Sequence, residues 1–282
     1  MRSIRLAAGL LVLGVFSQSQ AITILTTFVS SGNPFGGGLG NAGGAGNMAG
    51  GGDLVSVFNA AADYWENAIL DDFTVQLNFG WQALGSGTLG VHTLFTEGGS
   101  PHRELTGNIR FTNAAGINWF ADSTPFSHTE YTTPNTFSAN LGGGVMNTGR
   151  TFTGATGNAS GRTDLLSVAL HEIGHSLGLS SANEAFLAGN GDLDVDVTSP
   201  RPFAGSSIPT VSGAHINLTN ALMFPSIGTS LRRLPSDADI IANMQISQFT
   251  QMGSIVPEPA SMAALGLGVL AVVRRRKSTK KS

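Results

Sequence analysis

The 282-residue chain contains no cysteine. This absence excludes disulfide bonds and thiolate ligands, so any metal site must use nitrogen and oxygen donors. Basic side chains are scarce between the two ends, because residues 22–256 hold seven arginines, no lysine and 17 acidic residues, which leaves a charge of −10. A surface of this sign repels phosphate backbones, so nucleic acid is not expected as a partner. The charge favours soluble behaviour outside the cell.

Long apolar runs are also absent. The two short apolar runs lie near the amino and carboxyl termini, and neither reaches the roughly 20 residues that a membrane-spanning helix needs. At the amino terminus, Arg2 and Arg5 precede an apolar run from Leu6 to Phe16, and small residues follow at Ser19 and Ala21. This order is typical of a signal peptide. We therefore expect residues 1–21 to be a signal peptide that is cleaved after Ala21.

The carboxyl-terminal segment, residues 254–282, has three parts. A Pro257-Glu258-Pro259 tripeptide precedes an apolar stretch from Met262 to Val273 and a basic cluster from Arg274 to Lys277. This arrangement resembles the PEP-CTERM sorting signal of Gram-negative envelope proteins. The resemblance implies transient membrane anchoring and processing by an exosortase-type enzyme. The basic cluster is expected to stay cytoplasmic, so the rest of the protein would be exported to the cell surface or secreted.

Between the ends, the residues suited to chemistry are concentrated in His171-Glu172-Ile173-Gly174-His175. On a helix, residues four apart lie on one face, so His171 and His175 can point at one ion. Two of the usual three protein ligands of a catalytic zinc ion are then in place. Glu172 follows the first ligand, where a carboxylate could act as general base on a water that the metal activates.

The spacing of the surrounding apolar residues supports a helix. Leu166, Leu170, Ile173 and Leu177 form one apolar stripe, which would pack on a sheet while the histidine face lines a cleft. Thr163 or Asp164 is available as the N-cap. Gly178 stands where a glycine in the left-handed conformation commonly ends a helix, so the chain should turn after the second histidine.

The segment His171 to Leu179 resembles the active-site helix of the metzincin zinc peptidases, especially matrix metalloproteinases and leishmanolysin-like enzymes. The usual third histidine, three residues after the glycine, is replaced here by Ser181, whose hydroxyl is a poor zinc ligand. In leishmanolysin-like enzymes the third histidine follows an insertion, and His215 fits that pattern. The segment Ala221 to Pro225 resembles the methionine turn, with Met223 beneath the metal ligands. Four acidic residues remain alternative third ligands: Glu184, Asp192, Asp194 and Asp196.

The resemblance implies that residues 53–253 form one α+β metzincin-like peptidase domain with a twisted sheet, active-site helix, methionine turn and C-terminal helix. Residues 22–52 are expected to form an initial strand and a glycine-rich loop. Patterns of apolar residues and caps predict a helix after Asp53, a strand from Val75 to Trp81 and a final helix with Ser236 as its N-cap.

Two further expectations concern the cleft. Gly85 to Gly99 is loop-like in composition, and His92 and His102 are interpreted as surface or loop histidines because neither has a partner at metal spacing. The stretch Leu141 to Thr153 alternates weakly, and we hypothesise that it is the edge strand on which an extended peptide would bind.

The acidic stretch Asp192-Leu193-Asp194-Val195-Asp196 permits calcium binding, but it lacks the glycine and terminal glutamate of an EF-hand loop. An exposed strand or turn with solvated carboxylates is the favoured interpretation. Zinc is therefore the main cofactor expected, with calcium a second possibility.

The sequence thus predicts a zinc-dependent endopeptidase that acts on protein or peptide substrates, with metal ligands His171, His175 and His215 and general base Glu172. Latency through a zinc-capping cysteine, known in some metzincins, is impossible in this chain. The alternative is a catalytically inactive envelope protein that keeps the fold and binds zinc or a partner. Ser181 favours this alternative, whereas Glu172 argues against it. A glycine-rich spacer without any site is a third reading.

Overall fold

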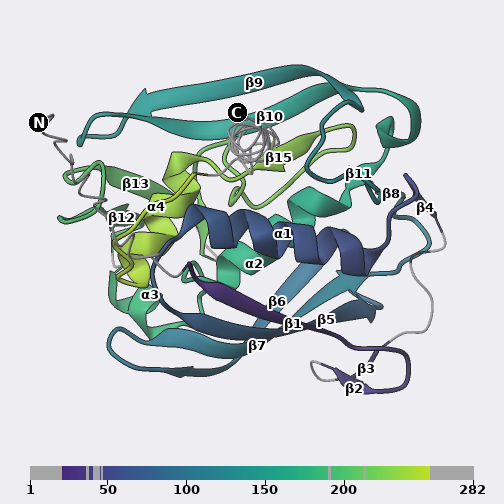
Figure 1. Cartoon of the computed structure of the whole chain (residues 1–282), viewed down its shortest axis with the longest axis horizontal. Coiled ribbons are helices and arrows are strands. Elements are labelled where there is room, and N and C mark those ends of the chain that lie inside the picture. The colour runs from purple at the N-terminus through teal and green to yellow at the C-terminus, as the bar shows by residue number, and fades with distance from the viewer. Residues whose placement is uncertain are drawn as a thin grey trace, which may run out of the picture.

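A four-stranded sheet with the order β1-β5-β7-β6 underlies the structure, a computed structural model that describes residues 21–35, 38–40, 45, 47–189, 192–211 and 214–254 (Figure 1). The strands β1, β5 and β7 are parallel, and β6 runs antiparallel to β7 at the edge. Their bounds are Thr23–Phe28 for β1, Thr74–Gln82 for β5, Gly90–Gly98 for β6 and Arg103–Thr112 for β7. The initial strand expected within residues 22–52 and the strand predicted from Val75 to Trp81 are confirmed as β1 and β5. The loop predicted from Gly85 to Gly99 is wrong, because most of it forms β6.

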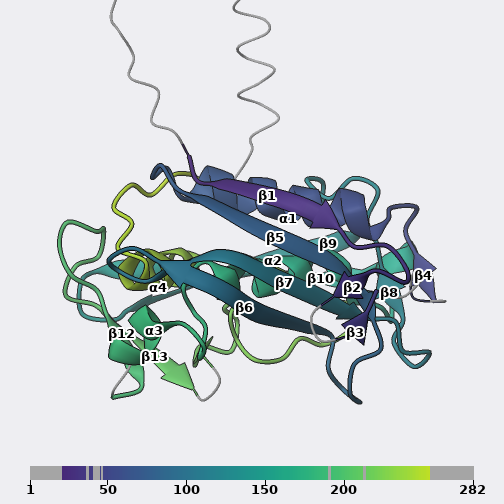
Figure 2. The same ribbon diagram turned by 90° about the horizontal axis from the view of Figure 1, so that it is seen from below.

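Two helices cover one face of this sheet (Figure 2). Helix α1 spans Leu54–Ala68 and has Asp53 as the N-cap of a capping box, and helix α2 spans Leu165–Ser176 and has Asp164 as its N-cap. Trp65 joins the helices, since its indole Nε1 donates a buried hydrogen bond of 2.9 Å to the carbonyl of Leu170. The expected helices and the N-cap at Asp53 are confirmed, and Asp164 is the cap that α2 uses.

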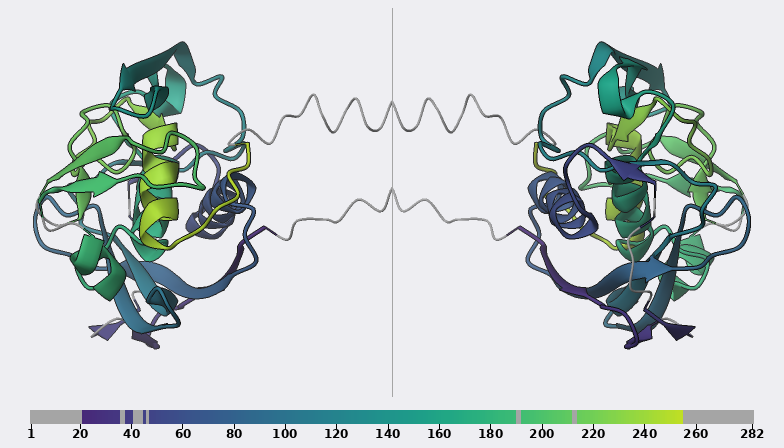
Figure 3. Two further views of the ribbon diagram at one scale, coloured as in Figure 1. Left: turned by 90° about the vertical axis from the view of Figure 1, so that its left-hand side faces the viewer. Right: turned by 90° about the vertical axis from the view of Figure 1, so that its right-hand side faces the viewer.

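A second sheet, with the order β15-β10-β9, lies on the other side of the helices, so α1 and α2 are enclosed between two layers (Figures 1 and 3). It consists of β9 (Tyr131–Asn140), β10 (Val145–Ala155) and β15 (Arg232–Leu234). Both neighbours of β10 are antiparallel to it. Strand β9 pairs along most of β10, whereas β15 pairs with the other side of β10 only at Arg150, Thr151 and Phe152. The hypothesis that Leu141 to Thr153 is an edge strand is therefore contradicted at these three residues, where both sides of β10 are occupied.

Short elements complete the described part of the chain. The segment after α2 contains a helix and three short strands. Ser236 caps the final helix α4 as predicted. The bounds are β2 Pro34–Phe35, β3 Gly38–Leu39, β4 Met48–Ala49, β8 Trp119–Phe120, the 3-10 helix η1 Gly157–Ala159, β11 Thr163–Asp164, α3 Glu184–Gly189, β12 Asp194–Asp196, β13 Ser207–Val211, β14 His215–Ile216 and α4 Asp237–Ile246.

A buried ion network fixes β15 to the start of α2. Arg232 is fully buried, and its Nη2 lies 2.8 Å from Asp122 Oδ2 and 2.9 Å from Asp164 Oδ1. Asp164 also accepts a hydrogen bond of 3.1 Å from the Ser167 backbone N–H. One carboxylate therefore caps the helix and pairs with the arginine, which holds the helix that carries the HExxH motif against the second sheet.

His128 contacts this network and makes the stability of the fold depend on pH. Its Nδ1 lies 3.2 Å from Arg232 Nη1, and its ring packs on Phe152. Burial, followed by the charge of Arg232, lowers the pKa of His128 to about 4, although Asp164 and Asp122 oppose this shift. Between the unfolded value of 6.5 and this pKa, the unfolded chain binds more protons, so stability falls as the pH falls.

We therefore expect the melting temperature of His128→Asn, which retains an acceptor for Arg232, to fall less between pH 6.5 and pH 4 than that of the unmodified protein. Thermal unfolding of both proteins across this range measures the difference. Parallel curves for the two proteins would show that His128 does not contribute.

Helices and sheets are thus mixed in one α+β arrangement. Among the described residues, the structure contains no helix with the length and apolar character needed to cross a membrane. The predicted signal peptide lies outside the described residues except for Ala21, and the sorting segment lies outside them except for Ser254.

Candidate metal and catalytic site

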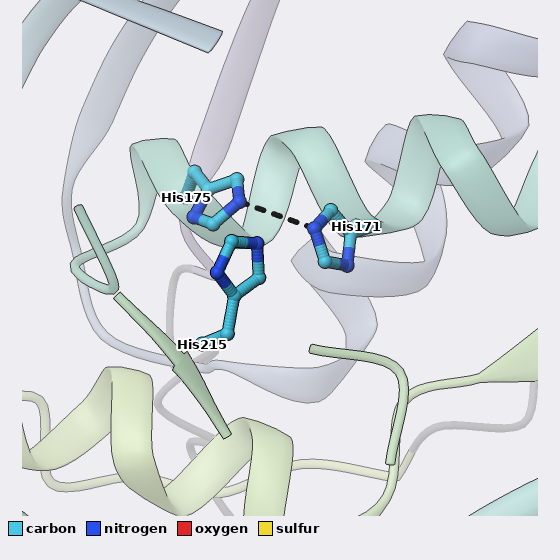
Figure 4. A group of neighbouring side chains, drawn as sticks. All are labelled: His171, His175 and His215. Atoms are coloured by element: carbon cyan, nitrogen blue, oxygen red, sulfur yellow. Dashed lines mark hydrogen bonds between the residues drawn. The ribbon is translucent and has the colours of Figure 1, made fainter. Parts of the chain in front are cut away.

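Three imidazole rings converge beside α2 (Figure 4). The ring centroid of His171 lies 4.7 Å from that of His175 and 5.2 Å from that of His215, and the last two are 4.9 Å apart. The nearest ligand atoms of the three side chains all lie within 4.8 Å of one another. Each of the predicted histidines is therefore placed where one ion could contact all three.

The hydrogen bonds of the two helical histidines leave their Nε2 lone pairs free. His171 Nδ1 lies 2.9 Å from the carbonyl oxygen of Leu222, and His175 Nδ1 lies 2.5 Å from that of Leu179. A carbonyl oxygen only accepts, so each Nδ1 carries the proton in the neutral ring. Burial also lowers the pKa of both rings, that of His175 to about 3, which favours these neutral forms.

The two Nε2 atoms are 3.1 Å apart, the contact drawn as a dashed line in Figure 4. Because neither atom carries a proton in the tautomers above, they cannot form a hydrogen bond with each other, and their lone pairs repel. Two nitrogen ligands of a tetrahedral zinc ion, each at about 2.0–2.1 Å, would be about 3.3 Å apart. The donor set and its spacing therefore fit a zinc ion.

The pairing of β14 with β13 positions His215. His215 begins β14 and pairs with Val211 of β13, after Ala214 adopts the left-handed conformation with φ of 63°. The N–H of Ile216 then donates to the carbonyl of Met223, which ties β14 to the segment predicted as a methionine turn.

The four acidic alternatives lie in other clusters of the structure. Asp192, Asp194 and Asp196 gather with one another, and Glu184 groups with Glu97 and His102. His215 is thus the candidate that joins His171 and His175 in the described part of the chain. Ser181 lines the same cavity.

Met223 is fully buried against the centre of α2. A Cβ atom placed on Gly174 would lie 2.4 Å from Met223 Sδ, so the glycine between the two histidines is what admits the methionine. Asp239 of α4 holds this turn, because its carboxylate accepts hydrogen bonds of 3.1 and 2.9 Å from the N–H groups of Leu222 and Met223. Since Leu222 also supplies the carbonyl for His171, this buried turn orients a candidate ligand.

Glu172 lies beside the histidines, 5 % exposed, in the wall of a cavity of about 460 Å³. Burial raises its pKa to about 8, against the opposing effects of the His92 backbone N–H and of Arg110. A nearby cation would favour the carboxylate, which is the form that a general base requires. A Cβ atom on Gly90 would lie 2.5 Å from Glu172 Oε1, so β6 approaches the carboxyl group closely only because residue 90 is glycine.

His92 corrects an expectation from the sequence, because it is not a surface histidine. Its side chain is 4 % exposed, and its Nε2 lies 2.8 and 2.9 Å from the two carboxyl oxygens of Glu104. Burial lowers the pKa of His92 to about 4 and raises that of Glu104 to about 9, so both groups favour the uncharged form. The contact between His92 and Glu104 therefore holds His92 in place, and the backbone N–H of His92 faces Glu172.

Sequence reasoning missed two residues that line this cavity, His92 and Arg233, and also Glu104, the buried partner of His92. The run from Val91 to Thr96, rich in β-branched and aromatic residues, was a signal for β6 that could have placed His92 on a strand. We see no sequence pattern that would have identified Glu104 or Arg233.

A comparison with protein-family models finds one match, the PEP-CTERM protein-sorting motif, at residues 256–277. No curated protein matches the chain. The chain therefore carries the predicted sorting motif, which implies recognition by an exosortase-type enzyme and export to the cell envelope. The match covers the sorting segment and does not extend to the residues around the three histidines.

Proposed function

We propose that the protein is a zinc-dependent endopeptidase with a metzincin-like fold, exported by a Gram-negative cell and acting at the cell surface or outside it. The convergence of His171, His175 and His215, with the Nε2 atoms of the two helical histidines 3.1 Å apart, is the observation that carries the proposal. Glu172 in the same cavity supplies the group that a purely structural zinc site does not need.

The residues of the cavity have separable roles in peptide hydrolysis. Zinc, when bound, would polarise the scissile carbonyl and lower the pKa of water. Glu172 would accept the proton of the attacking water and pass it to the leaving amine. The backbone N–H of His92 orients the Glu172 carboxylate, and the Leu222 and Leu179 carbonyls keep the two helical imidazoles in the metal-binding tautomer.

The edge strand β6 offers a binding mode for the substrate. It has β7 as its one neighbour in the four-stranded sheet, and its residues Gly90, Val91 and His92 line the cavity. An extended peptide can add to such an edge through backbone hydrogen bonds with little demand on its side chains. We therefore assign to β6 the role that the sequence had suggested for Leu141 to Thr153.

Arg233 gives the cavity a positively charged wall and suggests a preference among substrates. It is 6 % exposed, and its Nη1 and Nη2 donate to the carbonyls of Ser226 and Thr219 at 2.7 and 2.9 Å. Nη1 and Nη2 each carry a second N–H beyond these two hydrogen bonds. A substrate carboxylate reaching this wall would gain a charge-assisted hydrogen bond.

We expect peptides with glutamate beside the scissile bond to be cleaved with a kcat/KM roughly ten- to a hundredfold above their glutamine counterparts, the range expected for a hydrogen bond to a charged group. Arg233→Gln should bring this ratio close to one, and the matched control Arg162→Gln should leave it unchanged. The ratio is independent of the fraction of folded enzyme. A ratio near one in the unmodified protein would contradict the assignment.

The proposed activity is tested by casein cleavage under metal removal. We expect 1,10-phenanthroline to abolish cleavage, added zinc to restore it and a serine-protease inhibitor to have no effect. Cleavage that persists in the chelator would exclude a metal-dependent mechanism. Zinc-loaded protein that cleaves neither casein nor a peptide library would support the inactive envelope protein instead.

The inactive alternative has less support than the sequence suggested. Its main evidence was Ser181 in place of the third histidine, and His215 lies where a third ligand is needed. Phe224 and Pro225 follow Met223, where some metzincins have a tyrosine, so stabilisation of the developing oxyanion would fall to the metal or to other groups of the cavity.

A further inference from the structure

A second cluster of metal-ligating side chains lies away from the three histidines. Glu97 is near the end of β6, His102 is in the turn between β6 and β7, and Glu184 begins α3. One ligand atom of each side chain lies within 4.8 Å of those of the other two. Segments far apart in the sequence thus bring one imidazole and two carboxylates together.

The distances within this cluster are longer than those of ordinary ion pairs. His102 Nδ1 lies 3.4 Å from Glu184 Oε2 and 3.8 Å from Glu97 Oε1. Charge-assisted hydrogen bonds between nitrogen and a carboxylate are about 2.7–2.9 Å long. Nitrogen and oxygen ligands of a tetrahedral zinc ion, at about 2.0–2.2 Å from it, lie about 3.3–3.6 Å from one another. The side chains therefore surround a gap of roughly the size that a zinc ion requires.

Asn183, which is 1 % exposed, organises one side of the cluster. Its Nδ2 donates to Glu97 Oε2 at 3.1 Å and to the carbonyl of His102 at 2.9 Å, and the N–H of Glu184 donates to the same Glu97 oxygen at 3.3 Å. These donors fix the Glu97 carboxylate by one oxygen. The other oxygen, Oε1, is the one that faces His102.

We propose that Glu97, His102 and Glu184 bind a second zinc ion that joins the β6–β7 turn to the segment after the active-site helix. Zinc fits this donor set, because calcium and magnesium prefer oxygen ligands and an imidazole disfavours them. The side chain of His102 is 48 % exposed, so water has access to a fourth ligand position. The ion would steady β6, whose other end lines the cavity beside Glu172. This site does not depend on the proposed peptidase activity.

The test is the zinc content of the full chain after equilibration with zinc, measured by mass spectrometry and calorimetry. The unmodified protein should bind two zinc ions per chain, the second more weakly because its ligands are more exposed. His102→Asn should reduce the count to one, and Glu184→Gln should weaken the second binding event at least tenfold. Asp192→Asn, a control in the separate acidic cluster, should retain both ions. One ion in the unmodified protein, or a second ion that persists in His102→Asn, would overturn the proposal.

A second measurement avoids any effect of the substitutions on folding. In the unmodified protein, the ring ¹⁵N resonances of His102 should shift as the second equivalent of zinc is added. Resonances of His102 that remain unchanged during this addition would overturn the proposal, whatever happens at the other histidines. If only the His102 resonances fail to shift, the second zinc site is excluded while the three-histidine site is unaffected. The two sites are therefore tested separately.

Discussion

Glu172→Gln is expected to reduce kcat for peptide cleavage about 100- to 10,000-fold, the range in which a positioned general base contributes. The amide keeps the shape of the carboxyl group but cannot accept the proton of the attacking water. The metal ligands are untouched, so zinc content should stay at the unmodified level. Glu172→Ala should give the same pattern. Casein or peptide cleavage, measured together with bound zinc, checks both expectations.

The control for this experiment is Asp72→Asn, at an exposed acid in the turn before β5. It changes the charge by the same amount at a remote position and should leave kcat and zinc content unaltered. A Glu172→Gln protein that retains kcat within about fivefold of the unmodified enzyme would show that another group is the base, since loss of a general base typically costs far more.

His215→Ala is expected to remove both zinc and activity. The substitution takes away one of three imidazoles, and zinc affinity should fall by more than the roughly 10- to 100-fold that accompanies loss of a supporting hydrogen bond. A carboxylate cannot replace the ring, because the acidic residues once considered as third ligands lie in separate clusters. Zinc titration in a His102→Asn background measures the three-histidine site alone.

His128→Asn is the matched histidine control for this experiment. It lies in the Arg232 network and should keep the affinity of the three-histidine site near neutral pH. Retention of tight zinc binding and full activity by His215→Ala would contradict the assignment of His215 and would point to a ligand outside the described residues.

Local signals in the sequence located much of the framework. Asp53 and Ser236 start helices as predicted because an N-cap acts on backbone groups only a few residues away. The HExxH spacing placed His171 and His175 on one face of α2 for the same reason. Features that depend on contacts within one helical turn could therefore be inferred from the residues alone.

Features that depend on strand order could not be inferred. The choice between β10 and β6 as the edge strand is decided by which strands pair with them, and alternation of residues carries no information about neighbours. The residues from Val91 to Thr96 indicated a strand, but the burial of His92 could not be inferred, because its partner Glu104 lies on the adjacent strand β7. His215 was found only through the resemblance to leishmanolysin-like enzymes, since a ligand brought back by a long insertion has no fixed spacing from the helix.

Anomalous diffraction at the zinc edge, from crystals of the zinc-loaded protein, tests the central claim most directly. We predict a peak at about 2.0–2.1 Å from one ring nitrogen each of His171, His175 and His215. A zinc-loaded crystal with no peak between these rings, or with a peak bound by the two helical histidines while His215 points elsewhere, would contradict the three-histidine site and the hydrolytic function proposed from it.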